Sequence, residues 1–185
     1  MHRYPVHTIE SAPEKSRTPL TLIRDTVGFV PNLAGTMAHS PTLITGFAGA
    51  LANFNAGSFS PGQRQTLLLT NAVTNRCAWA VAFHSTLALR AGVDVDDVAA
   101  IRQRRLPRDP KLAALSQLTR TLIEHRGHLD DRAATAFTAA GFTADQVFEV
   151  LAGLAVSTMA NYAGNIATPP LEPAFEAQAW AAPPG

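Results

Sequence analysis

The stretch from residue 64 to residue 90 decides the fold, and it reads RQTLLLTNAVTNRCAWAVAFHSTLALR. It is long and apolar, with the periodicity of helices rather than strands. The preceding segment, Ser60-Pro61-Gly62-Gln63, has the form of a helix start in which Ser60 is the N-cap and Gln63 its capping-box partner. Gly92 marks the end of the stretch. Residues 74–76 (Thr-Asn-Arg) predict a break in its middle, with Asn75 as the N-cap of the second half.

Helix signals continue on both sides of this stretch, and alternating β-type runs are absent. Caps, prolines at the first helical position and closing glycines place the boundaries. We expect further helices over residues 19–29, 32–39, 41–55, 94–104, 109–127, 130–140 and 143–165. The sequence therefore predicts an all-α protein, with an extended arm before the first helix.

Composition excludes several classes of function. The 185 residues include 15 basic and 14 acidic side chains, and this net charge of +1 argues against an electrostatic nucleic-acid binder. Only 16% of the residues are charged, against about 25% in an average domain, so we expect a partner to cover part of the surface in a homo-oligomer. No apolar run is long enough to span a membrane, and no signal-peptide core follows the N-terminus. We therefore expect a cytoplasmic protein.

Cys77 is the one cysteine of the chain, which excludes an intrachain disulfide and a zinc site made of several thiolates. In the first turn of a helix, backbone N–H groups and the helix dipole favour a thiolate, and Arg76 adds positive charge. His84 follows on the same helix face, ~10 Å farther along the axis, and Ala80 between the two leaves room for water or substrate. The alternative is structural, since a free cysteine is commonly a small buried apolar residue. A helix histidine can likewise be held by a carbonyl or a subunit interface.

The octet Cys77-Ala78-Trp79-Ala80-Val81-Ala82-Phe83-His84 resembles the Cys-x-x-Cys-x-x-x-His segment of the carboxymuconolactone decarboxylase-like proteins, which include alkylhydroperoxidase D. Further segments are similar, in order and spacing, to the longer peroxidase-related members: residues 30–33 (VPNL), 38–41 (AHSP), 85–88 (STLA), 91–93 (AGV), 109–112 (DPKL), 141–143 (GFT) and 161–171 (NYAGNIATPPL). The resemblance covers residues 18–178 and implies a single-domain, all-α, AhpD-like fold that forms a dimer, trimer or hexamer. Residues 1–17 are then an N-terminal arm, and residues 179–185 a loose tail.

The sequence departs from this family at positions that handle electrons and protons. The family's peroxidases use two cysteines, and Ala80 stands in place of the second, so a two-cysteine peroxidase cycle is excluded. Gln65 stands where alkylhydroperoxidase D has a glutamate that serves a proton relay. Asn165 stands where the similar segment near the C-terminus ends in histidine. Of the family's proton-handling groups, Cys77, His84 and the phenol of Tyr162 remain.

We therefore expect an enzyme that acts on a small organic molecule, without metal or cofactor, by acid/base chemistry of the lyase, isomerase or decarboxylase type. The expected catalytic residues are Cys77, His84 and Gln65, and the expected substrate-binding residues are Trp79, Ala80, Phe83, Tyr162 and Asn165. Two alternatives stay open. One is a one-cysteine alkylhydroperoxidase, in which an external thiol resolves the sulfenic acid of Cys77. The other is a catalytically silent binding or scaffold protein.

Overall fold

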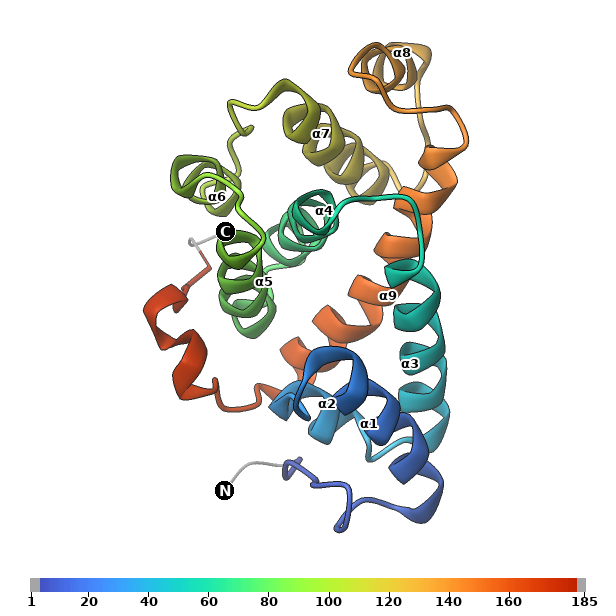
Figure 1. Cartoon of the computed structure of the whole chain (residues 1–185), viewed down its shortest axis with the longest axis vertical. Helices are drawn as coiled ribbons and strands as arrows, with labels where there is room; N and C mark the ends of the chain where they lie inside the picture. The colour runs from blue at the N-terminus through green and yellow to red at the C-terminus, as the bar shows by residue number, and fades with distance from the viewer. Residues whose placement is uncertain (1–3, 183–185) are drawn as a thin grey trace.

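The computed structural model describes residues 4–182, and within them the chain forms helices and no strand. The predicted all-α fold is confirmed. The elements, in chain order, are α1 (Glu14–Val27), α2 (Asn32–Met37), α3 (Pro41–Asn55), α4 (Pro61–Thr74), α5 (Ala78–Arg90), α6 (Val95–Arg102), α7 (Pro110–Glu124), α8 (Asp131–Ala139), α9 (Gln146–Ala167) and the 3₁₀ helix η1 (Pro173–Gln178). Figure 1 shows α9 running through the molecule, with α3 alongside it and α2 near its C-terminal end. None of the helices in the described part of the chain combines the length and apolar character needed to cross a membrane.

Helices α4 and α5 pack against each other at the centre of the fold. The predicted capping box opens α4, since the Ser60 N–H donates to Gln63 Oε1 over 2.9 Å and the Gln63 N–H donates to Ser60 Oγ over 3.3 Å. The break between the two helices lies where the sequence predicts it, but its caps differ. Asn75 is the C-cap of α4, and Cys77 is the N-cap of α5. Arg76 has a left-handed backbone (φ +57°), which turns the chain back within one residue.

The first helix begins at Glu14, earlier than the predicted start at Pro19. Tertiary packing outweighs the helix-breaking tendency of the proline here. Ser16 is buried and its hydroxyl donates to the backbone oxygen of Ala38 over 2.8 Å, and Leu20 is fully buried in the first hydrophobic cluster. The predicted arm therefore ends inside a helix. At the other end, residues 183–185 of the predicted tail lie outside the described residues.

Two glycines of α9 allow this helix to lie close to its neighbours. A Cβ atom added to Gly153 would lie 2.7 Å from Leu67 and 2.8 Å from the ring of Phe54. A Cβ atom added to Gly164 would lie 2.7 Å from the Sγ atom of Cys77. All three distances are shorter than van der Waals contact, so these positions of α9 admit no side chain without movement of their neighbours. The Gly164 contact fixes the place of α9 relative to the start of α5.

We predict that Gly164→Ala destabilises the fold by about 1–3 kcal/mol, because the added methyl group overlaps Cys77 Sγ. Urea unfolding measures this loss. Gly49→Ala in α3 is the matched control, because nothing lies within 4 Å of the added Cβ. Replacing an unhindered helix glycine by alanine should raise stability by about 0.5–1 kcal/mol. The Gly164→Ala penalty should shrink in a Cys77→Ala background, and an equal penalty in both backgrounds would contradict the overlap.

Candidate functional site

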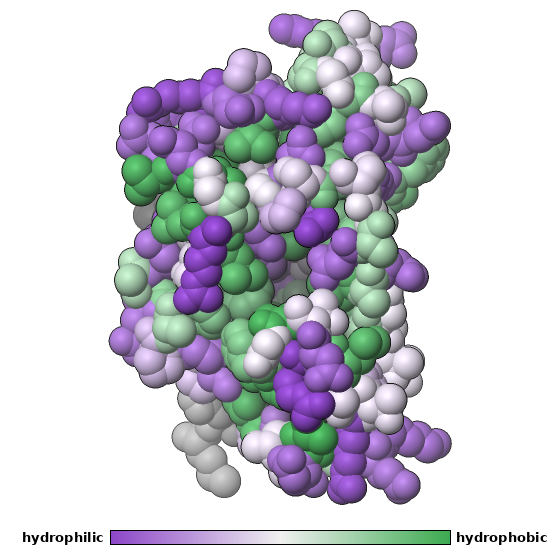
Figure 2. Space-filling model, in the orientation of Figure 1, coloured by the Kyte–Doolittle hydropathy of each residue, from purple (hydrophilic) through white to green (hydrophobic). Residues whose placement is uncertain are grey.

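A cavity of about 560 Å³ lies between the α4–α5 pair and helices α1, α2, α3 and α9, and its volume is typical of small-molecule sites. Figure 2 shows this face of the molecule hollowed near its centre, with hydrophobic side chains visible between hydrophilic ones. Most of the lining is apolar. The polar and charged residues that line the cavity are Thr26, Asn55, Arg64, Gln65, His84, Arg90 and Ser157.

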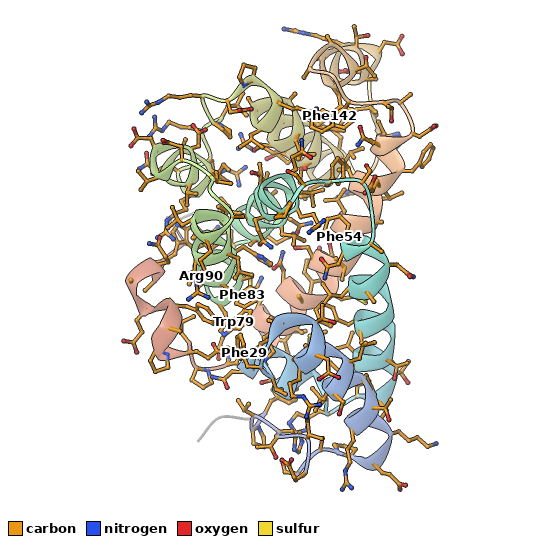
Figure 3. The ribbon with its side chains drawn as sticks, in the orientation of Figure 1. Phe29, Phe54, Trp79, Phe83, Arg90 and Phe142 are labelled. Atoms are coloured by element: carbon orange, nitrogen blue, oxygen red, sulfur yellow. The ribbon has the colours of Figure 1, made fainter. Side chains whose placement is uncertain are left out.

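One wall of the cavity consists of aromatic side chains from α5. The rings of Trp79 and Phe83 stack with their centroids 4.9 Å apart and an interplanar angle of 19°. Phe175 of η1 meets the Phe83 ring edge-on at 5.1 Å. The indole N–H of Trp79 donates to Glu172 Oε2 over 2.9 Å, which fixes the orientation of the ring. Figure 3 shows Trp79, Phe83 and Arg90 in succession along α5. Trp79, Ala80 and Phe83, for which the sequence predicts substrate binding, all line the cavity.

His84 and Gln65 meet at the cavity wall. Gln65 comes from α4 and His84 from α5, and the His84 Nδ1 atom lies 2.9 Å from Gln65 Oε1. Because a carboxamide oxygen only accepts hydrogen bonds, Nδ1 carries the proton and Nε2 keeps its lone pair. Burial lowers the pKa of His84 to about 3, so the imidazole is neutral at physiological pH. The pair thus presents one neutral ring of fixed tautomer to the cavity.

Cys77 does not line this cavity. Its side chain is 1% exposed and packs against Gly164. The backbone N–H groups of Trp79 and Ala80 point to the sulfur, as expected at a helix N-terminus, and they favour the thiolate. Desolvation is the larger effect, however, and it raises the pKa of the Cys77 thiol. The surroundings of Cys77 therefore favour the neutral thiol, which agrees with the structural alternative that the sequence left open beside an activated thiolate.

Two predicted substrate-binding residues lie away from the cavity, although both are on α9. Tyr162 is 56% exposed and lines a second, separate groove. Asn165 is exposed, and its amide donates to the backbone oxygen of Asn75 over 2.9 Å. Sequence analysis also missed Arg64 and Arg90 as lining residues. Helical spacing from His84 gave no signal for Arg90, since a separation of six positions turns two side chains of α5 about 120° apart.

No group of three or more His, Cys, Asp or Glu side chains within residues 4–182 is arranged to hold a metal ion. In the segment 124–128, His125 caps the end of α7 and Arg126 and Gly127 both have left-handed backbones. The chain therefore leaves the helix between His125 and His128, the two histidines of this segment. Apart from Arg64 and Arg90, the ionisable side chain that lines the cavity is His84.

Comparisons with known proteins place the fold. Residues 39–121 match the model of the carboxymuconolactone decarboxylase family. A solved structure of an uncharacterized peroxidase-related protein with an alkylhydroperoxidase AhpD core, from Ralstonia eutropha JMP134, is 19% identical, with 94% of each chain covered and a TM-score of 0.80. The debrominase Bmp8 in its apo form is 18% identical, with 95% of this chain and 94% of that chain covered and a TM-score of 0.74.

A peroxidase-related protein from Silicibacter sp. TM1040 is 12% identical, with 90% of this chain and 89% of that chain covered and a TM-score of 0.73. A comparison with curated proteins gives no match. The predicted family resemblance is confirmed over residues 39–121, and the AhpD-like fold is confirmed over most of the chain.

We predict that acidification destabilises the fold through His84. The folded pKa is about 3 and the unfolded value about 6.5, so the unfolded chain alone binds the proton between these values. The contribution of His84 to the free energy of unfolding is complete above pH ~6.5. It falls as the pH approaches 3, by up to about 1.4 kcal/mol per pH unit. Urea unfolding between pH 7 and pH 4 measures the slope. His84→Gln, which keeps a donor for Gln65, should give a shallower slope, and parallel curves would contradict the prediction.

Proposed function

We propose that this protein is an enzyme that transfers a proton on a small organic molecule bound in the cavity, with His84 as the acid/base group and no bound cofactor. The match to the carboxymuconolactone decarboxylase family and the AhpD-like fold support a small-molecule enzyme. A Bmp8 variant with cysteine replaced by alanine has been solved with 2,3,4-tribromopyrrole, so a protein of this fold binds a small aromatic ring. The observation that carries the proposal is the hydrogen bond between Gln65 and His84 at the wall of an otherwise apolar cavity.

The proposed reaction begins with the free lone pair of His84 Nε2. Gln65 holds the ring so that Nε2 remains an acceptor, and the stacked Trp79 and Phe83 rings form an apolar wall of the same cavity. In an elimination or isomerisation, Nε2 takes a proton from carbon, and the C–H electron pair forms a new double bond as a leaving group departs or the charge moves to oxygen. In a decarboxylation, carbon dioxide leaves with its bond electrons remaining on carbon, and that carbon then takes up a proton from water that Nε2 relays.

Of the two residues on which the sequence centred the chemistry, His84 rather than Cys77 carries the proposal. A one-cysteine peroxidase needs an accessible thiolate to attack the peroxide. Cys77 is 1% exposed, and burial raises the pKa of its thiol. We assign Cys77 a packing role behind the aromatic wall, where Gly164 covers its sulfur.

We predict that His84→Gln lowers kcat/KM by about 100-fold or more, the usual contribution of a general acid/base group. The assay incubates the protein in D₂O with a panel of small lactones, β-keto acids and enol acids. Proton NMR detects substrate loss and deuterium incorporation at carbon. Gln65→Leu should lower kcat and change the pH profile, since the ring loses its fixed tautomer while side-chain volume is nearly kept.

Cys77→Ala is the control for this experiment and should retain turnover. Thermal unfolding followed by circular dichroism checks that each variant folds. An equal loss of activity in Cys77→Ala and none in His84→Gln would move the reaction centre to the sulfur. Absence of turnover by the wild-type protein across the panel would favour the silent binding protein instead.

The protein is also proposed to form a homo-oligomer through the outer face of α9. Phe148, Leu151, Tyr162 and Ile166 are between 51% and 74% exposed, and their spacing places them on one side of the helix. The one charged residue of α9, Glu149, is engaged by Ser58, whose hydroxyl donates to it over 2.6 Å. An uncharged apolar face fits a second copy of itself without repulsion between like charges.

We predict that Leu151→Glu shifts the protein from oligomer to monomer, because it places a charge within this apolar face. Size-exclusion chromatography with light scattering measures the mass. Leu22→Glu on α1 is the control, since Leu22 is similarly exposed (44%) but distant from α9 in sequence and outside this face. A monomeric wild-type protein, or an unchanged mass in Leu151→Glu, would contradict the proposed interface.

A further inference from the structure

The charged residues that line the cavity are two arginines, Arg64 and Arg90, and no aspartate or glutamate lines it. Neither arginine forms an ion pair with a carboxylate among residues 4–182. Arginine keeps its charge at all physiological pH values. The cavity therefore carries two positive charges that nothing in the described chain balances, beside a neutral His84.

The fold brings these two arginines to the same end of the α4–α5 pair. Arg64 stands directly before Gln65, which bonds His84 of the opposite helix, and Arg90 lies at the end of that opposite helix. The two helix ends are close, since a Cβ atom added to Gly62 would lie 3.9 Å from the backbone oxygen of Ala91. The two arginines therefore start from the same end of the cavity lining, Arg64 half-buried and Arg90 exposed.

Helix electrostatics explain the position of Arg90 but not that of Arg64. A cation in the last turn of a helix is stabilised by the helix dipole, and Arg90 ends α5. Arg64 instead follows the first three residues of α4, where the dipole disfavours a cation. It is partly buried and held in place by a hydrogen bond of 2.6 Å from Nη1 to the backbone oxygen of Phe59. This anchoring leaves the remaining N–H groups of the guanidinium available to a ligand.

We propose that the cavity binds a small carboxylate with a planar apolar body, whose carboxylate pairs with Arg64 and Arg90 while its ring lies against Trp79 and Phe83. Arginine matches the planar carboxylate with paired N–H donors, and the aromatic wall suits a flat ring. This inference rests on the proposed function, which makes the cavity the active site, and it adds the chemical class of the substrate.

Such a ligand also bears on the proposed proton transfer. A negative charge in a mostly apolar cavity favours the protonated form of a nearby imidazole. Bound carboxylate would therefore raise the basicity of His84 above that of the empty cavity. The same group that anchors the substrate would make the ring a better base towards it.

Calorimetric titration with 2-naphthoate and with 2-naphthamide tests the proposal, because the two probes share shape and differ in charge. The wild-type protein should bind the acid about tenfold or more tighter than the amide. Arg64→Gln and Arg90→Gln should each weaken binding of the acid about tenfold, and both should leave the amide unchanged. Arg132→Gln on α8, an exposed arginine outside the cavity, is the matched control and should change neither.

Equal binding of the acid and the amide would overturn the proposal. So would a preference for the acid that survives in the double variant, or binding of neither probe at about 5 mM. Melting curves of the variants exclude misfolding as the cause of any loss. This experiment measures binding, so it is separate from the test of catalysis. A preference for the acid together with full turnover in His84→Gln would contradict the proposed catalysis and still support this inference.

Discussion

The hydrogen bond between Gln65 and His84 is the interaction on which the site depends. It joins two helices whose connection is only residues 75–77, and the left-handed Arg76 within it lets α5 return along α4. An amide does not titrate, so Gln65 Oε1 remains an acceptor for His84 Nδ1 whatever the pH. A carboxylate at position 65 would stabilise an imidazolium, whereas the amide oxygen fits the neutral ring that burial already favours.

The aromatic wall is held from outside by the C-terminal segment. Glu172 accepts one hydrogen bond from the indole of Trp79 and another, over 2.7 Å, from the backbone N–H of Asn32. One carboxylate therefore connects α5, the start of α2 and the C-terminal segment. Arg102 adds a second tie, since it donates to Ser85 Oγ and to the backbone oxygen of Gln178. With the outer side of α5 tied in this way, the stacked pair of Trp79 and Phe83 lines the cavity.

Helix boundaries that are set by capping residues could be predicted from the sequence. Boundaries that are set by tertiary packing could not. Ser60 with Gln63 and the residues around Gly92 act within one turn, so their effects follow from sequence. The start of α1 does not, because the burial of Ser16 and Leu20 against the rest of the fold outweighs the preference of Pro19. The caps at 75 and 77 depended on a left-handed residue that is not glycine, which sequence patterns rarely indicate.

The candidate site shows the same division. Trp79, Ala80 and Phe83 share a helix with His84, so helical spacing placed them at one cavity. The direction of the Tyr162 side chain depends instead on how α9 is rotated about its own axis, and α9 is a long apolar helix without a distinct polar face. Residues two apart on a helix point in nearly opposite directions. Once Gly164 faces Cys77, Tyr162 must face outward, but that contact is visible only in the folded chain.

The placement of Arg64 links the electrostatics of the fold to the proposed chemistry. A cation near the start of a helix costs free energy, and burial of part of the side chain adds to that cost. The hydrogen bond to the Phe59 carbonyl recovers only part of it, since the guanidinium lacks a carboxylate partner among the described residues. A ligand anion would remove this imbalance and, in the same step, favour proton uptake by His84. A negatively charged substrate would then be favoured twice, once in binding and once in reaction. A neutral molecule of the same shape would leave the two arginines without a counter-charge and His84 a weak base.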